Sequence, residues 1–510
     1  MIKKGKRMSI IDKPIEGKEL EAFFEEQIGD LKEQFVHFLS QFDGTDLFHK
    51  WRELIRHIDE LYNITSLTTI EEDELLLRCN INILYEPRFG RVLEIVDNRY
   101  GSNVKNRFLK SCIMLSALNM AYAHHGQTWN CSRTLEEAFA RCQAMRLYYV
   151  TMLLFIPKYC KGRKRVEFID LLNIFQPMID MCLVNIRTAY NALMVNHCID
   201  NFKATPHKYG LAFNYDYNHL EREYLEPMRM TIVDVMQNMS DVEKSLLPKD
   251  GVKVLYGYEE LMQGIALSSA VYEKYGLNEI DNFKQMVGLA DDLKGYLRDN
   301  YAFIVPEEVF RELMKKYSKL HLIFKWDGFD EMLNSRPAFF KFDGYYYSTV
   351  LLYQRYMVNE EQRLLEKKKK FQVDSGFVFE KEVKRVLEEF GYDVRCDVKR
   401  INRKEFDVVC VKDDCIYNFQ CKNNSVGVSL QGEDWFGWTC SAIKRLNRYY
   451  EKELSKEDNR EELLKQKIGL DTVKSYVISR FPVISNNPRI INFNGLRKFL
   501  FMMEMQRAVC

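Results

Sequence analysis

The chain has 510 residues, of which 46% are hydrophobic and 29% charged, so we expect two or three domains rather than one core. Its net charge of +1 excludes a uniformly basic protein with a global attraction to nucleic acid. Its most apolar stretches, 111–123 and 147–157, are shorter than the ~20 residues of a membrane span. No apolar run follows the basic start at 1–7. We therefore expect a cytoplasmic protein without a signal peptide or a membrane partner.

Residues 15 to about 245 are predicted to be mostly helical, because apolar residues recur there at three- and four-residue spacing. The predicted helices cover 19–39, 46–62, 106–123, 134–154, 168–194 and 221–238. A Leu-Pro-Lys-Asp-Gly sequence at 247–251 interrupts the helical pattern. The sequence therefore predicts a helical domain of unknown role at 1–250.

The pattern changes between 251 and 370, which we predict to be a helical segment with a β-hairpin and a linker helix. Helices are predicted at 281–300 and 306–317, with Pro306 in a first turn, and strands at 320–324 and 338–342. Asp343-Gly344 then predicts a tight turn into the aromatic run 345–347, which is either a packed hairpin or a base-stacking platform. The charged helix 350–370 ends in four lysines, which form either a solvated face or a phosphate contact.

The third predicted domain, 371–510, alternates helices and strands. The expected order is helix 377–390 closed by Gly391, strands 392–398, 405–411 and 416–422, helix 439–454, strands 473–479 and 489–493, and helix 496–506. The segment 361–510 holds 29 Lys and Arg against 23 Asp and Glu, or +6 in a chain of net +1. This asymmetry favours a polyanionic partner for the C-terminal part.

Several familiar chemistries are not favoured by the sequence. Thirteen cysteines occur without a Cys-x-x-Cys pair, and most lie in apolar runs, which favours reduced core thiols over disulfides or zinc. A Walker A loop, a Gly-x-Gly-x-x-Gly motif and a nucleophile elbow are all missing from the sequence. The chain is therefore not expected to act by itself as an ATP-driven translocase, a dehydrogenase or an esterase.

Four polar residues in the third domain have the chemistry that phosphodiester cleavage needs. Asp407 lies in an apolar strand and offers a carboxylate, the ligand type that Mg²⁺ prefers. Gln420 and Lys422 are two positions apart in the next strand, so they share a face, with Cys421 on the other. Gln420 offers a carbonyl oxygen, and Lys422 is either a charge stabiliser or a proton acceptor. Glu380, on the preceding helix, would complete a metal shell directly or through water.

These residues resemble the motif of the PD-(D/E)xK nuclease superfamily. The matching segments are Gly376-x-x-Phe379-Glu380, Phe406-Asp407 and Gln420-Cys421-Lys422, and Gln-x-Lys as the third element is closest to the Mrr-like restriction endonuclease branch. The resemblance covers about 371–510. It implies an α-β-β-β-α-β core, with Asp407 and Gln420 as ligands of Mg²⁺ or Mn²⁺, Glu380 assisting and Lys422 catalytic.

The expected fold is thus multidomain α+β, with a large helical N-terminal region before a C-terminal α/β restriction-endonuclease-like domain. The expected function is metal-dependent cleavage of DNA, most simply double-stranded, by a homo-oligomer. Restriction or antiphage defence, with an additional defence-system subunit, is implied by the resemblance alone. The helical region would regulate, recognise or oligomerise. The alternatives are an RNA nuclease, a nuclease fold that binds nucleic acid with little or no cleavage because Gln420 replaces an acid, and a signalling protein with the nuclease domain as its effector.

Basic residues after the active strand are candidates for nucleic-acid contact. Lys444 and Arg448 are one helical turn apart, and Arg445 lies beside them, so together they predict a face that follows a phosphate backbone. Asn423 would reach a phosphate or lie in an ordinary turn. Trp435 and Trp438 either pack or stack on bases.

Overall fold

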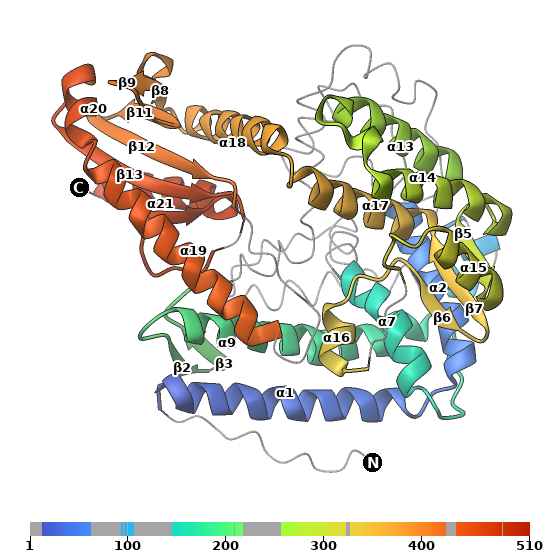
Figure 1. Ribbon diagram of the computed structural model, residues 1–510. Coiled ribbons are helices and arrows are strands. Elements are labelled where there is room, and N and C mark those ends of the chain that lie inside the picture. The colour runs from blue at the N-terminus through green and yellow to red at the C-terminus, as the bar shows by residue number, and fades with distance from the viewer. Residues whose placement is uncertain are drawn as a thin grey trace. The chain divides into compact units, whose positions relative to one another are not determined.

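The computed structural model describes residues 13–62, 93–94, 96–98, 100–106, 145–208, 210–217, 257–322, 327–424, 435–481 and 483–509. These residues form helices and several small sheets (Figure 1). The predicted helices 106–123, apart from residue 106, and 221–238 lie outside this part of the chain. Within it, every helix is too short or too polar to cross a membrane.

The chain divides into two compact units that do not follow chain order. Unit 1 comprises Met1–Ile28, Arg187–Tyr224 and Lys369–Cys510, and unit 2 comprises Gly29–Ile186 and Leu225–Lys368. The last segment of unit 1 begins two residues before the predicted boundary at 371. Unit 1 also includes two segments of the predicted domain 1–250. Most of the predicted domain 1–250 and nearly all of the predicted segment 251–370 lie together in unit 2.

A five-stranded sheet forms the centre of unit 1. Its strand order is β14-β13-β12-β11-β8, with bounds Ile490–Asn492, Thr472–Ser479, Cys415–Lys422, Val408–Lys412 and Asp393–Val394. β8, β11 and β12 are antiparallel neighbours, whereas β13 and β14 run parallel to β12. The β11–β12 hairpin turns at Asp413 and Asp414, whose φ angles of 51° and 56° suit the type I′ turn that matches strand twist.

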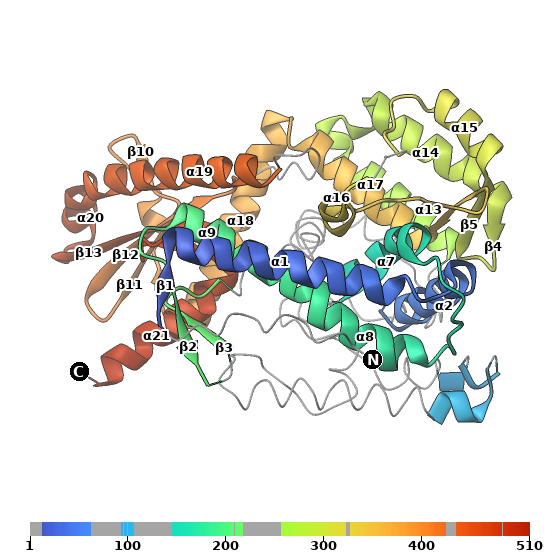
Figure 2. The same ribbon diagram turned by 90° about the horizontal axis from the view of Figure 1, so that it is seen from below.

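Helices cover both faces of this sheet. They are α18 (Lys369–Glu389), α19 (Trp435–Asp458), α20 (Glu461–Ile468) and α21 (Leu496–Val509). Figure 2 shows α19 and α21 on opposite sides of the strands. On the α21 side, Phe419 of β12 stacks on Tyr476 of β13 with ring centroids 5.4 Å apart, and Tyr476 meets Phe499 of α21 at 5.3 Å.

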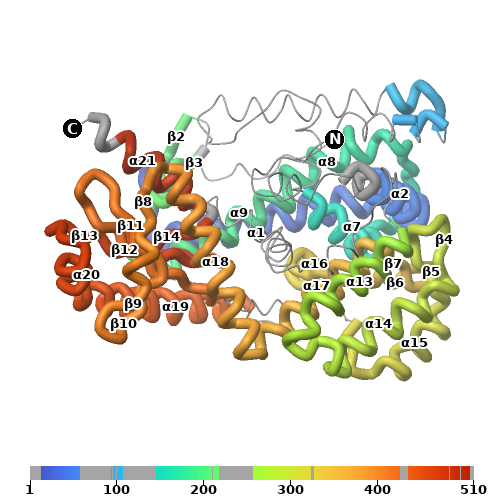
Figure 3. Tube along the Cα trace, turned by 90° about the horizontal axis from the view of Figure 1, so that it is seen from above, coloured from blue at the N-terminus to red at the C-terminus, as the bar shows by residue number. Residues whose placement is uncertain are grey.

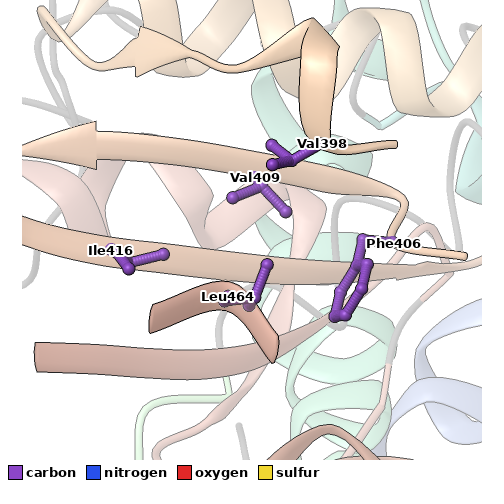
Figure 4. Close-up of a cluster of buried hydrophobic side chains, with 5 residues drawn as sticks. All are labelled: Val398, Phe406, Val409, Ile416 and Leu464. Atoms are coloured by element: carbon purple, nitrogen blue, oxygen red, sulfur yellow. The ribbon is translucent and has the colours of Figure 1, made fainter. Parts of the chain in front are cut away.

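The opposite face is closed by α19 and α20. Tyr450 and Leu454 of α19 pack with Val477 of β13 in one buried cluster. In a second cluster, Leu464 of α20 packs with Val409 of β11 and Ile416 of β12 (Figure 4). Val398 and Phe406, which precede β11 in the chain, complete this cluster. Phe406 is anchored there directly before Asp407, so this cluster fixes the backbone at the entrance to β11.

A small antiparallel sheet completes the described part of unit 1. Its order is β1-β2-β3, with bounds Ile15–Glu16, Lys203–His207 and Gly210–Phe213. Helices α1 (Gly17–Leu39) and α9 (Asn185–Cys198) begin or end beside it in sequence. Tyr190 of α9 contacts Trp435 of α19, with ring centroids 5.3 Å apart. The region 15–245 was predicted to be mostly helical, and these three strands were not among its predicted elements.

Unit 2 combines helices with a four-stranded antiparallel sheet of order β4-β5-β7-β6. The strands are Leu297–Arg298, Ala302–Pro306, Tyr345–Thr349 and Phe340–Phe342. Helix α2 (Gly44–Tyr62) lies beside β6 and β7, where Phe48 stacks on Phe342 at 4.2 Å (Figures 1 and 3). The other helices are α7 (Arg146–Tyr159), α8 (Gln176–Met178), α13 (Tyr258–Tyr272), α14 (Asp281–Leu293), α15 (Glu307–Lys316), α16 (Phe329–Asn334) and α17 (Val350–Leu365).

The prediction from sequence was more accurate for the type of each element, helix or strand, than for the residues at which it begins and ends. The hairpin 338–347 is confirmed as β6 and β7, and the predicted helix 168–194 is helical but contains π-helical turns at Leu171–Phe175 and Ile179–Val184. The prediction of a helix at 281–300 is wrong after Leu293, where α14 ends. Residues 320–322, the described part of the predicted strand 320–324, do not form a strand. Pro306 ends β5 and precedes α15 instead of occupying its first turn.

Boundaries in unit 1 differ in the same way. α18 begins at Lys369 rather than 377, since α17 stops at Leu365 and the linker helix ends there. The predicted strand 392–398 is only β8 followed by a 3₁₀ turn at Cys396–Val398. A short hairpin, β9 (Arg400–Ile401) with β10 (Lys404–Glu405), and helix α20 were not predicted.

Leu464→Ala should lower the free energy of unfolding by about 2–4 kcal/mol, because Leu464 is fully buried and its removal leaves a cavity between α20 and the β11–β12 hairpin. Denaturant titration of the full chain, followed by circular dichroism, measures the loss. The exposed neighbour Glu462 supplies the control variant Glu462→Ala. Equal effects of the two substitutions would contradict the packing described.

Candidate metal and phosphodiester site

The side chains of β12 alternate between the two covered faces, as predicted. Asn418 donates to Glu457 of α19 at 2.9 Å, and Lys422 donates to Glu453 of α19 at 2.8 Å. Gln420 lies between them and shares their face. Cys421 has the opposite orientation. The strand therefore presents a polar row, Asn418, Gln420 and Lys422, beneath α19.

Asp407 lies beside this row because of the register of the hairpin. The last residue pair of β11 and β12 is Val408 with Phe419, so Asp407 stands opposite Gln420. Its Oδ2 accepts a hydrogen bond from the Cys421 amide at 2.8 Å and another from Gln420 Nε2. Burial raises the pKa of Asp407 to about 6, although Lys422 and the Cys421 amide act in the opposite direction.

Gln420 is only 8% exposed, and its carbonyl oxygen is in an unusual position. While Nε2 donates to Asp407, Oε1 is buried and accepts no hydrogen bond among the described residues. Leaving such an acceptor without a partner costs free energy comparable to a lost hydrogen bond. Gln420 therefore carries a buried carbonyl oxygen without a hydrogen-bond partner among the described residues, while its Nε2, rather than this oxygen, faces Asp407.

Glu380 approaches the same point from α18. Burial raises its pKa to about 7, and the charge of Asp407 adds to the increase, so the two carboxyl groups are close enough to interact. Its Oε2 lies 3.8 Å from Lys399 Nζ, which works against the increase. The predicted Glu380, Asp407 and Gln420 are thus gathered at one end of the β11–β12 pair.

Lys422 is held as an ammonium group. Both ends of the Lys422–Glu453 ion pair are nearly buried, with the side chains 12% and 10% exposed. Burial acts to lower the pKa of Lys422, but the hydrogen bond to Glu453 and the nearby Tyr449 and Asp407 outweigh it, and the pKa is raised. Of the two roles that the sequence left open, this favours charge stabilisation over proton acceptance.

Asn423 has internal partners. Its amide nitrogen donates to Ser375 of α18 at 2.8 Å, and its amide oxygen accepts from Arg480 at 3.2 Å. Arg480 also donates its backbone N–H to the carbonyl of Lys422 at 2.9 Å. Asn423 therefore ties the end of β12 to α18 and to the residue after β13, a structural role that the sequence did not indicate.

The predicted basic face is present on α19 and exposed. Lys444, Arg445 and Arg448 are all solvent-accessible, and Arg445 is one turn from Tyr449, whose ring lies 5.8 Å from Lys422 Nζ. Trp435 is buried against Tyr190, whereas Trp438 is 42% exposed. Trp435 therefore has a packing role, and of the two tryptophans Trp438 is the one that a ligand could contact.

The donor set suits a hard divalent cation only in part. Within the described residues, groups of three or more His, Cys, Asp or Glu side chains with metal-binding geometry are not found. The set here is two carboxylates and one amide oxygen, to which water would add ligands, as is common for Mg²⁺. The orphaned Gln420 Oε1 and the two destabilised carboxylates are the observations that fit such an ion.

Two residues that contact the candidate site were not predicted from the sequence. Glu453 pairs with Lys422, and Lys399 pairs with Glu380. A signal for Glu453 existed, because it and Glu457 are acids one turn apart on the face of α19 that carries Tyr450 and Leu454. Lys399 had none, since it lies in the turn between β8 and β9.

Comparison with known proteins gives no relative. No protein-family model matches the chain, and neither a curated protein nor a solved structure matches it. The function is therefore inferred from the residues of the site.

Asp407→Asn should stabilise the protein at pH 8 in divalent-free buffer by about 1–2 kcal/mol, a figure discounted for partial solvent access. The pKa of Asp407 is raised to about 6 on folding, so the unfolded state releases its proton first as pH increases. The carboxyl group therefore reduces stability progressively from about pH 4 to pH 6, and the penalty persists above that range. Asparagine cannot ionise, so the Asp407→Asn variant lacks this loss of stability.

Thermal unfolding at pH 4 and pH 8 measures this difference. The gain should be present at pH 8 and absent at pH 4. Glu388→Gln, which removes an exposed acid from α18, is the control and should give no such dependence. A gain from Asp407→Asn that is equal at both pH values would contradict the burial of an ionised Asp407.

Proposed function

We propose that unit 1 is a metal-dependent nuclease that hydrolyses phosphodiester bonds of double-stranded DNA with Mg²⁺ or Mn²⁺. The observation that carries this proposal is the buried, unpartnered Oε1 of Gln420 beside Asp407, with Glu380 and Lys422 at the same strand end. If the short hairpin β9–β10 and helix α20 are set aside as insertions, the remaining order α18, β8, β11, β12, α19, β13 agrees with the α-β-β-β-α-β core of the PD-(D/E)xK superfamily.

Four side chains of the site would each have a separate role in the reaction. Asp407 and Gln420 would hold the ion, with Glu380 bound to it directly or through water. When bound, such an ion supplies an activated water and neutralises charge on the phosphate. Lys422, fixed by Glu453, would place a positive charge where negative charge develops in the transition state.

Ion binding requires one local change, a half-turn of the Gln420 amide. In the arrangement described, Nε2 faces Asp407 Oδ2 and Oε1 has no partner. Rotating the amide would bring Oε1 next to the carboxylate, and two oxygens in that arrangement repel each other unless a cation lies between them. Ion binding would therefore break the hydrogen bond from Gln420 Nε2 to Asp407 Oδ2.

The basic face of α19 supports DNA as the substrate. Lys444, Arg445 and Arg448 are exposed on the helix that also holds Lys422 through Glu453. A phosphate backbone that followed this face would lead toward the site. A single site of this kind cuts one strand at a time, so a homo-oligomer would cut both. We place the activity in restriction or antiphage defence, with unit 2 as the regulatory or recognition part and with an additional subunit as a candidate partner.

The second candidate is a nuclease fold that binds nucleic acid without cutting it. One observation favours it: Asp407 Oδ2 already accepts two hydrogen bonds, which would compete with an ion for that oxygen. Gln420 also contributes no negative charge, which weakens metal affinity. RNA in place of DNA is the remaining alternative, because the site contacts a phosphodiester common to both.

Cleavage of supercoiled plasmid and of duplex RNA with Mg²⁺ or Mn²⁺ tests the proposal. Asp407→Ala and Lys422→Ala should each reduce the rate at least ~100-fold, because the first removes a ligand of the ion and the second removes a positive charge that stabilises the transition state. Lys467→Ala, on the exposed surface of α20, is the matched lysine control and should retain the rate. Cleavage of RNA alone would assign the alternative substrate. Binding without cleavage of either polymer would establish the non-cutting module.

Replacement of Lys444, Arg445 and Arg448 by alanine should weaken DNA binding about tenfold or more near physiological salt, because phosphate contacts and released counterions are lost. The slope of log affinity against log salt concentration should become shallower by roughly two to three. Fluorescence anisotropy with a labelled duplex at several salt concentrations measures both. An unchanged slope would place the DNA on another face.

A further inference from the structure

Unit 2 contains a pocket of about 180 Å³ that none of the preceding chemistry uses. It is lined by residues of α2, by Leu153 in α7, by residues of strands β4 to β7 with the turn after β4, and by the start of α17. The polar and aromatic residues that bear on its chemistry are Arg52, Arg56, Arg298, Tyr301, Tyr347 and Thr349. The pocket therefore concentrates three guanidinium groups on one small space.

Arg52 is the central one of these groups. Its guanidinium carbon lies 4.2 Å from the centre of the Tyr347 ring, which holds the planar group by a cation–π contact. Burial lowers the pKa of Arg52, yet no carboxylate among the described residues forms an ion pair with it. A largely desolvated guanidinium without an anionic partner is unfavourable unless a ligand supplies one.

Arg298 adds a second guanidinium group, which is exposed rather than buried. Its side chain donates to the neighbouring carbonyl of Leu297 at 3.1 Å and, within the described residues, forms no ion pair. Two acids also line the pocket: Asp299 pairs with the pocket residue Arg56 at 3.1 Å, and Glu53 accepts a hydrogen bond from Tyr100, so three arginines stand against two acids. The pocket is thus positively charged overall.

The start of α17 contributes to the same potential. Thr349 caps this helix by accepting the Leu352 amide at 3.1 Å, and both residues line the pocket. The positive end of the helix dipole therefore lies at the pocket wall. His49 contributes little charge at neutral pH, since burial and Arg52 lower its pKa.

We propose that this pocket binds a phosphate-class oxyanion, either inorganic phosphate or pyrophosphate or the phosphoryl group of a small molecule. A guanidinium fork matches phosphate oxygens bidentately, and Arg52 is held in place by its stacking on Tyr347. A pocket of about 180 Å³ admits several water molecules, so it has room for a small anion such as pyrophosphate but not for a nucleic-acid strand. The site is independent of the proposed nuclease chemistry.

Isothermal titration of the full chain with sodium pyrophosphate in EDTA tests this proposal. The wild type should bind one equivalent. Arg52→Gln and Arg298→Gln should each weaken binding at least about tenfold, the effect of losing one charged hydrogen-bonding group. Arg311→Gln removes an exposed arginine paired with Glu307 and should leave the affinity within about twofold of the wild type.

Parallel titrations distinguish the sources of the anion. Tighter binding of adenosine monophosphate than of inorganic phosphate would identify a phosphorylated small molecule, and the reverse would identify the free anion. Arg298 is exposed, so its variant keeps the test valid if Arg52→Gln fails to fold. Absence of pyrophosphate binding at millimolar concentration, or equal binding by the wild type and Arg298→Gln, would overturn the proposal.

Discussion

The antiparallel pairing of β11 with β12 is the constraint on which the candidate site depends. Its register joins Val408 to Phe419 and so sets Asp407 opposite Gln420. Because β12 is also held by its pairing with β13, a shift of one residue in the β11–β12 pairing would turn Asp407 to the other face, away from Gln420. The I′ turn at Asp413 and Asp414 and the buried cluster around Phe406 hold this register from both ends of β11.

The cost of the arrangement is electrostatic. Two carboxyl groups with raised pKa values and one orphaned carbonyl oxygen lie together in a largely buried place, where their charges are poorly solvated. Sites of this kind reduce stability and persist where a function requires them. The Lys422–Glu453 pair behaves differently, because each ion satisfies the other, so the lysine is charged and fixed before any substrate arrives.

Sequence patterns predicted the local features of unit 1 well. Alternation correctly placed Gln420 and Lys422 on one face, and the two aspartates correctly marked the hairpin between β11 and β12. Patterns of this kind do not carry tertiary information, so Glu453 and Lys399 as partners, and the register that aligns Asp407 with Gln420, could not be predicted. The short strands β2 and β9 also escaped, since Pro206 is atypical of a strand and two residues are too few for a periodic signal.

The pocket of unit 2 could not be predicted from the sequence either. Arg52, Arg298 and Tyr347 come from three distant parts of the chain, and each alone looks like an ordinary surface residue of a helix or a strand. Their charge and stacking become meaningful only when the sheet brings β4 and β7 beside α2.

Binding of Mn²⁺ to the full chain, followed by electron paramagnetic resonance, tests the central claim most directly. The account predicts a bound ion that is lost in Gln420→Leu, which removes the orphaned oxygen, and retained in Gln466→Leu on the exposed surface of α20. Equal Mn²⁺ binding by the wild type and Gln420→Leu, or no binding by either, would contradict it.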